Sequence, residues 1–376
     1  MKILQLFSDW KWTGPAEPML QLSRTLRSRG HECDIICSAA PPDIEGSVQS
    51  RAAADGVAPL YTMSHARGAR WGRDTPEVRR LREALATRAY DVIHTWHTRD
   101  HVLALRAAGR RRAARPRIVR SVASTDLLPA FPWNRWLFGP GSDGVLCTSA
   151  AAARAMDRMR GGRPCLGVLG AVDVEHFRPA EPDPALRAEL GLPPDAHVIG
   201  IAARVQRHRR FDLLLDALVR LREADASAYL LVLGRGTYIR EVAEEPAARL
   251  GIADRVVLAG YRGGDYLDSL RAMDVFTFLV PGSDGSCRAL LEAASCGLPA
   301  VTSARGALPE IVVDGQTGFV VPEDADALAG AWGRLLGDGQ RRAAMGAAAR
   351  HRAETHFRPE RYAADVENLY EAVLAG

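Results

Sequence analysis

Short apolar runs of strand length alternate with helical patterns along this chain, and they do so in two series. Alternation of this kind predicts a parallel, doubly wound α/β sheet that helices cover on both faces. The ligand crevice of such a sheet lies beyond the carboxyl ends of its strands. The strands predicted in the first series are Lys2–Phe7, Glu32–Ser38, Asp91–His94, Arg117–Val122 and Gly144–Thr148. The helices predicted between them lie near Ala16–Arg29, Thr75–Arg88, Arg99–Arg112 and Ser149–Arg160.

A stretch rich in proline and acidic residues, GAVDVEHFRPAEPDP, separates the two series and has the composition of a linker. The sequence therefore predicts two Rossmann-like domains that face each other across a cleft, with boundaries at 1–170, a linker over 171–184 and a second domain over 185–358. An amphipathic pattern over 359–376 predicts a final helix that packs back on the first domain. The strands predicted in the second series are His197–Ala203, Tyr229–Gly234, Arg255–Ala259, Asp274–Val280, Pro299–Ser303 and Gly318–Val321.

Composition excludes several classes of protein. With 47% hydrophobic and 25% charged residues, the 376-residue chain is typical of soluble globular proteins. A net charge of +4 is too small to indicate nucleic-acid binding, although arginines cluster at 67–73, 110–117 and 207–210, either as solvated faces or as local basic sites. The six scattered cysteines form no Cys-x-x-Cys pair, which favours reduced thiols in a cytoplasmic protein. No apolar run reaches the length of a membrane span, so we expect neither a signal peptide nor an anchoring helix.

The stretch LVPGSDGSCRALLEAASCGLPAV, from Leu279 to Val301, places a glycine-bearing loop between a strand and a helix. Backbone N–H groups at such a helix start, together with the helix dipole, favour an anion such as phosphate. If the helix begins near Ser286, Asp284 lies in the mouth of the loop and Glu292 follows two turns later. Two acceptors would then flank one anion site.

A second cationic loop follows the strand at 197–203. Guanidinium groups match phosphate oxygens in a bidentate manner, and this loop belongs to the same predicted sheet edge as the helix start near Ser286. The loop is thus suited to gripping a diphosphate with Arg204, Arg207, Arg209 and Arg210.

These motifs together resemble the bacterial retaining glycosyltransferases of family 4, also called glycosyl transferases group 1, which have the two-domain GT-B fold. The most specific block is SDGSCRALLEAASCGLPAVTSARGALPEIVVDGQTGFVVPEDADALA, over 283–329. Supporting blocks are GAVDVEHFRP (170–179), IAARVQRHRRFDLLLDAL (201–218), VVLAGY (256–261) and TGPAEPMLQLSRTLRSRGHEC (13–33).

The resemblance implies a role for each residue of the donor side. Glu292 resembles the acceptor of the donor's ribose hydroxyls, Asp284 the contact to the transferred sugar, and Arg204 and Arg209 the cations on the diphosphate. Arg209 stands where the family has lysine. The base would be read near Tyr261–Arg262 and Arg235–Gly236. The full predicted donor set is Gly14, Arg204, Arg209, Gly234, Arg235, Tyr261, Arg262, Asp284, Gly285, Ser286, Cys287, Arg288, Ala289 and Glu292.

The first domain departs further from the family pattern. Of the family's paired glycines only Gly14 is present, after Thr13, and the catalytic-site histidine of a His-Gly-Thr-Asp-like turn maps to Ala123, three residues before Asp126. His97, in HTWHTRDH, could supply an imidazole instead. The alternative is that these histidines are surface residues with ordinary pKa values.

Two further signals have a structural and a functional interpretation. Asp324 and Asp326 could be a metal-binding pair, but their place before a helical pattern favours N-capping, and the resemblance implies transfer without a metal or other cofactor. The aromatic loop FPWNRWLF, over 131–138, together with the arginines at 110–117, could form a hydrophobic and basic lip for a lipid-linked acceptor at an anionic membrane, or its aromatic side chains could pack in the core.

The resemblance implies a retaining, metal-independent transfer of a sugar from a UDP- or GDP-sugar to the hydroxyl of a sugar, lipid-linked or small-molecule acceptor. The expected setting is synthesis of surface polysaccharide, lipopolysaccharide, glycolipid or a natural-product glycoside in the cytoplasm, with a possible peripheral contact to the inner face of the membrane. The expected catalytic set is Arg204, Arg209, Asp284, His97 and Asp126. Two alternatives are a nucleotide-sugar 2-epimerase of the same fold and a non-catalytic nucleotide-sugar-binding partner.

Overall fold

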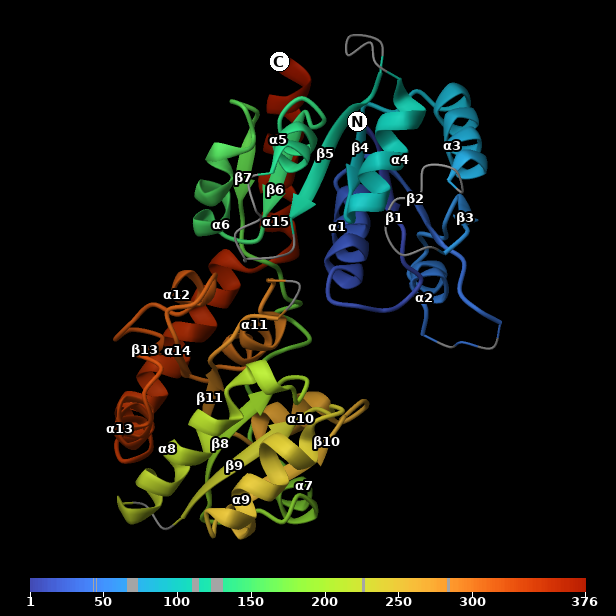
Figure 1. Ribbon diagram of the computed structural model, residues 1–376. Coiled ribbons are helices and arrows are strands. Elements are labelled where there is room, and N and C mark those ends of the chain that lie inside the picture. The colour runs from blue at the N-terminus through green and yellow to red at the C-terminus, as the bar shows by residue number, and fades with distance from the viewer. Residues whose placement is uncertain are drawn as a thin grey trace. The chain divides into compact units, whose positions relative to one another are not determined.

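The computed structural model describes residues 1–42, 44, 46–65, 74–109, 115–122, 131–224, 227–282 and 285–376 (Figure 1). The chain divides into two compact units. Unit 1 comprises Met1–Leu169, Ser283–Ser286 and Pro359–Gly376, and unit 2 comprises Gly170–Gly282 and Cys287–Arg358. No helix of the described part of the chain is long and apolar enough to cross a membrane.

Unit 1 contains a seven-stranded parallel sheet in the order β3-β2-β1-β4-β5-β6-β7. Its strands are β1 (Lys2–Phe7), β2 (Glu32–Ser38), β3 (Tyr61–Met63), β4 (Val92–Thr95), β5 (Arg117–Val122), β6 (Gly144–Cys147) and β7 (Cys165–Gly167). Its helices are α1 (Ala16–Ser28), α2 (Val48–Ala54), α3 (Thr75–Thr87), α4 (Thr98–Ala108), α5 (Pro132–Phe138), α6 (Ala150–Ala155), a 3-10 turn (Met156–Arg158) and α15 (Pro359–Ala375).

Unit 2 contains a six-stranded parallel sheet in the order β10-β9-β8-β11-β12-β13. Its strands are β8 (His197–Ala202), β9 (Ala228–Leu233), β10 (Val256–Gly260), β11 (Val275–Phe278), β12 (Ala300–Thr302) and β13 (Gly318–Val320). Its α-helices are α7 (Pro184–Glu189), α8 (Phe211–Ala224), α9 (Glu245–Arg249), α10 (Tyr266–Arg271), α11 (Arg288–Ser295), α12 (Leu308–Ile311), α13 (Ala325–Leu336) and α14 (Gly339–His356). Shorter helical turns span Arg207–Arg209, Arg240–Glu244 and Ala253–Arg255.

The prediction of two doubly wound parallel sheets is confirmed, because every strand pair in both sheets is parallel and helices follow the strands in chain order. Two strands, β3 and β7, were not predicted. Each has three residues and lies at an edge of the unit 1 sheet. Edge strands are often short, which limits edge-to-edge association, and three residues are too few for a periodic pattern.

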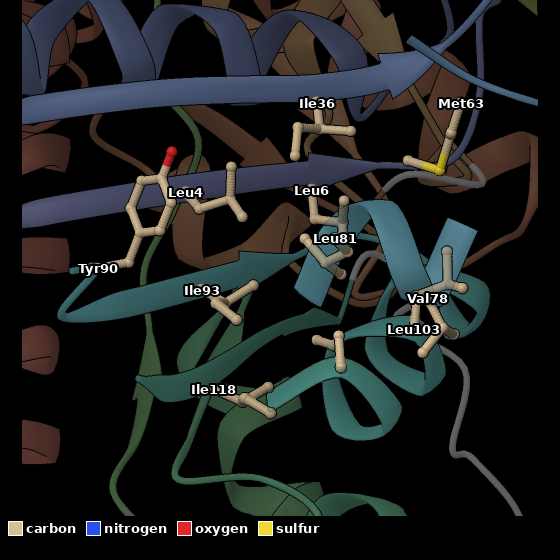
Figure 2. Close-up of a cluster of buried hydrophobic side chains, with 12 residues drawn as sticks. Leu4, Leu6, Ile36, Met63, Val78, Leu81, Tyr90, Ile93, Leu103 and Ile118 are labelled. Atoms are coloured by element: carbon tan, nitrogen blue, oxygen red, sulfur yellow. The ribbon is translucent and has the colours of Figure 1, made fainter. Parts of the chain in front are cut away.

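One apolar cluster of unit 1 forms between the sheet and the helices α3 and α4 (Figure 2). Leu4, Leu6, Ile93 and Ile118 project from adjacent strands toward Leu103 and the other apolar side chains of this cluster. Leu4 and Leu6 are two apart in β1, which puts them on one face of the sheet. The cluster thus fixes the strand ends from which the loops of unit 1 emerge.

The C-terminal helix α15 belongs to unit 1 and packs against α1 and the sheet. Glu367 accepts hydrogen bonds from Arg29, at 2.6 Å, and lies 2.5 Å from Nε2 of His31. The Tyr370 hydroxyl lies 2.6 Å from Nδ1 of the buried His94. The last helix of the chain therefore completes the unit that the first strand begins.

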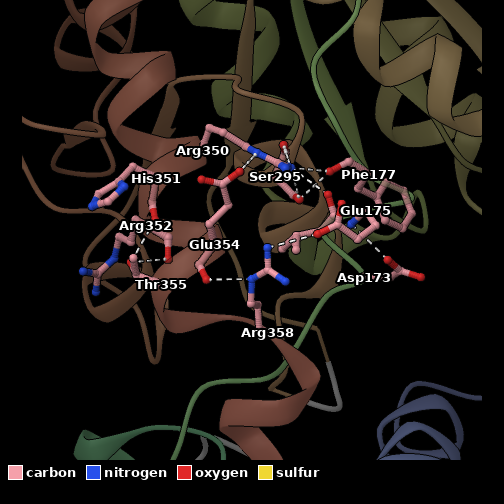
Figure 3. A network of polar contacts seen from close by, with 11 residues as sticks. Asp173, Glu175, Phe177, Ser295, Arg350, His351, Arg352, Glu354, Thr355 and Arg358 are labelled. Carbon is pink, nitrogen blue, oxygen red and sulfur yellow. Dashed lines mark hydrogen bonds and ion pairs between the residues drawn. The ribbon is translucent and has the colours of Figure 1, made fainter.

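In unit 2, Arg350 of α14 joins three separate segments (Figure 3). Its Nη1 donates to the carbonyl oxygens of Val174, Phe177 and Ser295, each at 2.8 Å, and its Nε contacts Glu354 at 2.7 Å. The Ser295 hydroxyl also donates to the carbonyl of Phe177, at 2.6 Å. These contacts hold the segment after Gly170 against the C-terminal end of α11, so the helix is fixed at its far end.

Candidate functional site

The strand order of unit 2 reverses between β8 and β11, and this switch point is where parallel α/β sheets bind ligands. The two strands are neighbours, so the loops at their carboxyl ends meet. The loop after β8 carries the predicted arginines, and the loop after β11 leads into α11. The sequence-predicted site residues on these two loops are therefore brought together at one edge of the sheet.

Two arginines of the β8 loop are placed at this edge. The Nη1 of Arg209 donates to the carbonyl oxygen of Val280, at 2.6 Å, and its guanidinium lies 5.4 Å from the centre of the Phe278 ring. Arg204 is exposed, and among the described residues its side chain has no hydrogen-bond or ion-pair partner. A cation without a protein partner at a switch point is available to an anionic ligand.

The other two arginines of this loop are engaged by carboxylates. Arg207 pairs with Glu241 at 2.7 Å, and Arg210 pairs with Glu323, which also binds Arg305. The structure thus separates the four predicted arginines. Arg207 and Arg210 are paired with carboxylates, whereas Arg204 and Arg209 lie at the switch point. Glu323 was not predicted as a site residue; in the sequence it directly precedes Asp324, the N-cap of α13.

The helix α11 begins at Arg288, two residues later than predicted. The reason is the backbone of Cys287, which is left-handed at φ 51° and ψ 36° and so cannot belong to a right-handed helix. Gly285 is also left-handed, at φ 63°. The Cys287 side chain makes no capping hydrogen bond, and the first turn of α11 contains no acidic residue.

Glu292 is buried on α11 and both of its carboxylate oxygens have partners. The Tyr266 hydroxyl of α10 donates to Oε2 at 2.7 Å, and Nε of Arg288 lies 3.2 Å from Oε1. Burial and the neighbouring Glu292 charge raise the pKa of Tyr266 well above its ordinary value, so the phenol stays protonated and keeps donating. Tyr266 was missed by sequence reasoning because it lies 26 residues before Glu292 in a short helix with no motif.

The residues predicted to read the base lie at the ends of β9 and β10. The guanidinium of Arg235 lies 5.1 Å from the centre of the Tyr261 ring, which is 68% exposed. Arg262 instead pairs with Glu189, at 3.0 Å, and with Asp265. A Cβ at Gly234 would lie 2.0 Å from the carbonyl oxygen of Ala203, so this glycine is required by a close approach of two backbones.

The corresponding switch point of unit 1, between β1 and β4, is filled by Asp100. This fully buried carboxylate accepts backbone N–H bonds from Ser8 (2.7 Å), Trp96 (3.1 Å) and His97 (2.7 Å). Burial raises the pKa of Asp100, but the contacts to His97 and Ser8 outweigh burial and hold the pKa below its usual value. Gly14 lies in the turn that follows β1.

The histidines of the HTWHTRDH stretch are not all surface residues, and that alternative interpretation is wrong for two of them. His94 and His101 are fully buried, and burial lowers the pKa of each to about 3. His97 is half-buried at the start of α4, where its Nδ1 lies 3.3 Å from Oδ2 of Asp100 and its ring packs edge-on against Phe7. Of the three, only His97 combines partial exposure with a place at the strand end.

Several predicted residues lie outside the described part of the chain, namely Asp284, Ala123, Asp126 and the arginines at 67–73 and 110–112. Asp324 caps α13 by accepting from the N–H groups of Asp326 and Ala327, each at 3.0 Å, which confirms the N-capping interpretation. Within the described ranges, no group of three or more His, Cys, Asp or Glu residues could hold a metal ion. A separate groove of about 570 Å³ lies between α8 and α9 and includes Arg207, but it does not reach Arg204, Arg209 or Glu292.

Models of two protein families match the chain. The model described as Glycosyltransferase Family 4 matches residues 14–166, and the model described as Glycosyl transferases group 1 matches residues 196–338. The first match falls in unit 1 and the second in unit 2.

The relatives of the chain agree with these family matches. A GDP-mannose-dependent alpha-(1-6)-phosphatidylinositol monomannoside mannosyltransferase of Mycolicibacterium smegmatis is 33% identical over 279 residues, covering 70% of this chain and 72% of that protein. The lipopolysaccharide core biosynthesis mannosyltransferase LpsB of Rhizobium meliloti is 27% identical, covering 74% of this chain and 79% of that protein. Among solved structures, Anabaena HepE in complex with UDP and glucose has a TM-score of 0.78 at 20% identity, with 99% of this chain and 100% of that chain covered, a likeness of fold.

Proposed function

Because the chain belongs to the glycosyl transferases group 1 of glycosyltransferase family 4, we propose that it transfers a sugar from a UDP- or GDP-sugar to an acceptor hydroxyl with retention of anomeric configuration. The fold is GT-B, and the chain is a glycosyltransferase. We place the nucleotide diphosphate on unit 2. The observation that carries this proposal is the switch point, where Arg209 lies against the end of β11 and where Arg204 of the same loop has no partner among the described residues.

In the proposed reaction the acceptor hydroxyl attacks the anomeric carbon from the face that the diphosphate leaves. The bond from that carbon to the β-phosphate oxygen breaks, and the departing phosphate takes the proton of the acceptor hydroxyl. Arg204, Arg209 and the start of α11 would stabilise the negative charge that grows on the phosphate, which requires no metal ion. Glu292, held by Tyr266 and Arg288, would accept from the ribose hydroxyls.

We propose an acceptor from the cell envelope, such as a lipid-linked sugar, lipopolysaccharide or glycolipid. The names of the relatives support this choice, since they act on a phosphatidylinositol mannoside and on lipopolysaccharide core. Such an acceptor would bring the protein to the cytoplasmic face of a membrane. GDP-mannose is the first donor to test, because several of the similar proteins are named for it.

A thermal-shift screen of UDP, GDP, UDP-glucose and GDP-mannose tests the donor assignment. A ligand at a hundred times its dissociation constant adds about 2.7 kcal/mol to the stability of the folded protein. We expect one nucleotide series to raise Tm strongly and the other little. If no nucleotide raises Tm, the proposed donor site is wrong.

The products formed from the stabilising donor distinguish the proposed reaction from its alternatives. A transferase releases the sugar slowly to water in the absence of an acceptor, and proton NMR of an acceptor product reports the anomeric configuration. An epimerised donor would identify a 2-epimerase. A Listeria monocytogenes structure described as a putative UDP-N-acetylglucosamine 2-epimerase is similar to this chain in fold, with a TM-score of 0.64. Donor binding with no turnover at all would identify a binding partner.

A further inference from the structure

Three large aromatic side chains, Phe131, Trp133 and Trp136, are exposed at the surface of unit 1, with 64%, 45% and 45% of their area accessible. We call this set the α5 aromatic surface. The alternative that these side chains pack in the core is wrong for all three and right for Phe138. Single exposed apolar residues are normal, but three within six positions are a concentration that marks interaction sites.

The geometry of α5 turns these aromatic rings outward. Trp133 and Trp136 are three residues apart on the helix and so share a face, where their rings stack at 5.3 Å with an interplanar angle of 24°. Leu137 and Phe138 are buried, and Phe138 packs with Met156 and other members of an apolar cluster. Leu137 and Phe138 therefore attach α5 to the core, and the exposed aromatic side chains are not needed for that packing.

The surroundings of the α5 aromatic surface are cationic. Residues 131–163 contain five arginines, two aspartates and no lysine or glutamate, which gives a net charge of +3. One arginine, Arg160, pairs with Asp157 at 2.7 Å, and Asp143 pairs with Arg115. The other four arginines have no carboxylate partner among the residues that the structure describes; they are Arg135, Arg154, Arg158 and Arg163.

These arginines adjoin α5 because the segments that bear them pack against its C-terminal end. Phe138 and Met156 share one apolar cluster with Met159, and Ala152 and Ala153 of α6 pack against that cluster. A Cβ at Gly139 would lie 3.2 Å from the carbonyl oxygen of Met159, so the two backbones are close. Aromatic side chains, and arginines that have no carboxylate partner in the described ranges, are thus presented by one connected part of unit 1.

We propose that the α5 aromatic surface inserts into the headgroup region of a bilayer that contains anionic phospholipids. Tryptophan rings favour the interface between water and acyl chains, since one end of the ring is polar and the rest is apolar. Each arginine near an anionic bilayer adds attraction that an uncharged surface lacks. The inference rests on the proposed function for its purpose, the approach to a lipid-linked acceptor, but the binding itself needs neither donor nor acceptor.

Co-sedimentation with vesicles tests this proposal on the full chain. We expect the protein to bind vesicles of equal parts phosphatidylcholine and phosphatidylglycerol, and to bind phosphatidylcholine vesicles much less. The double variant W133A/W136A should lose about tenfold in partitioning because two partly exposed apolar side chains no longer enter the lipid. The double variant R154Q/R158Q should lose about fivefold per charge at low salt, and added salt should weaken binding of the unaltered protein.

Leu60→Ala is the matched control, because Leu60 is an exposed apolar residue of unit 1 that lies outside the α5 aromatic surface. Its vesicle binding should be unchanged, and circular dichroism should show native folding of all variants. The proposal is overturned if the unaltered protein does not bind the mixed vesicles, or if W133A/W136A binds them equally well. Concentration-dependent dimers that W133A/W136A abolishes, without vesicle binding, would assign the surface to a second copy instead. Nucleotide thermal shifts measured without vesicles report separately on the proposed function.

Discussion

The two units have the same central strand order but fill their switch points with opposite charges. In unit 1 the buried carboxylate of Asp100 occupies the position between β1 and β4 and accepts three backbone N–H bonds. In unit 2 the equivalent position between β8 and β11 presents Arg204 and Arg209. The topology provides the place for an anion, and the local sequence determines whether the anion belongs to the chain or comes from a ligand.

Under the proposed function, this difference suits the two units to different ligands. A fixed negative charge repels a diphosphate, so unit 1 is suited to a neutral hydroxyl-bearing acceptor, and the cations of unit 2 are suited to the diphosphate. Each of the following experiments changes one side of the comparison.

Acidification should destabilise unit 1. The pKa of His94 and of His101 is about 3 in the folded protein, whereas histidine in an unfolded chain titrates near 6.5. Between these values the unfolded chain binds protons that the native state does not bind, so the free energy of unfolding falls by about 1.4 kcal/mol per pH unit for each histidine. The loss should reach about 5 kcal/mol near pH 4.5 and vanish above pH 7. Urea unfolding at several pH values, with hydrogen exchange of β4 and α4, measures it, and a flat profile would contradict it.

Asp100→Ala should also destabilise unit 1, because three buried N–H groups lose their acceptor. At about 1–3 kcal/mol for each unsatisfied group, we expect a loss of about 4 kcal/mol in the free energy of unfolding. Asp100→Asn keeps a carbonyl acceptor and should cost less. Equal stability of the alanine variant and the unaltered protein would show that this carboxylate does not organise the switch point.

Arg204→Ala should leave stability unchanged and nearly abolish sugar transfer. The side chain is exposed and has no partner in the described structure, so folding does not depend on it. Loss of one group that stabilises the transition state commonly costs about 3 kcal/mol, or a hundredfold in kcat. Arg207→Ala, in the same loop but paired with Glu241, is the control and should retain most activity. Unchanged turnover of Arg204→Ala would remove Arg204 from the mechanism.

Tyr266→Phe should weaken donor binding without changing the chemical step. The variant loses the 2.7 Å hydrogen bond that holds Oε2 of Glu292, which is worth about 1 kcal/mol. We expect a rise of about fivefold in KM for the donor, with kcat unchanged. Tyr238→Phe serves as the control, since its ring stacks on Arg207 and does not touch Glu292. A fall in kcat alone would argue against a positioning role.

Cys287→Gly should have the smallest effect. Glycine adopts the left-handed backbone without the cost of about 1–2 kcal/mol that an L-residue pays, and this gain offsets the lost side-chain packing. The free energy of unfolding should change by less than about 1 kcal/mol. Cys287→Val places a branched side chain in the same backbone and should be clearly destabilising. If valine is tolerated as well as glycine, the left-handed start of α11 is not a constraint.

The sequence predicted the sheets well because buried parallel strands are continuous apolar runs, and several of them, such as Lys2–Phe7 and Arg117–Val122, match the structure at both ends. The start of α11 was predicted two residues early because no propensity marks Cys287 as left-handed. Tyr266 was not recognised as a site residue because its partner Glu292 is distant in sequence, and Asp100 was not recognised because the strand end that it bridges to is distant. Asp100 and Ser8, for example, are 92 residues apart, and only the folded sheet brings them together.

The place of α15 in unit 1 has a consequence for synthesis on the ribosome. Strand β1 leaves the ribosome long before α15, yet Tyr370 of α15 contacts the buried His94 of β4, and Glu367 of α15 binds Arg29 at the end of α1. Unit 2 is contiguous apart from one loop, so all of its strands emerge before unit 1 is complete. The strands of unit 1 therefore keep part of an apolar face uncovered until α15 has been synthesised. A chain that ends before residue 359 lacks α15, so the fold of unit 1, which begins with β1, is incomplete.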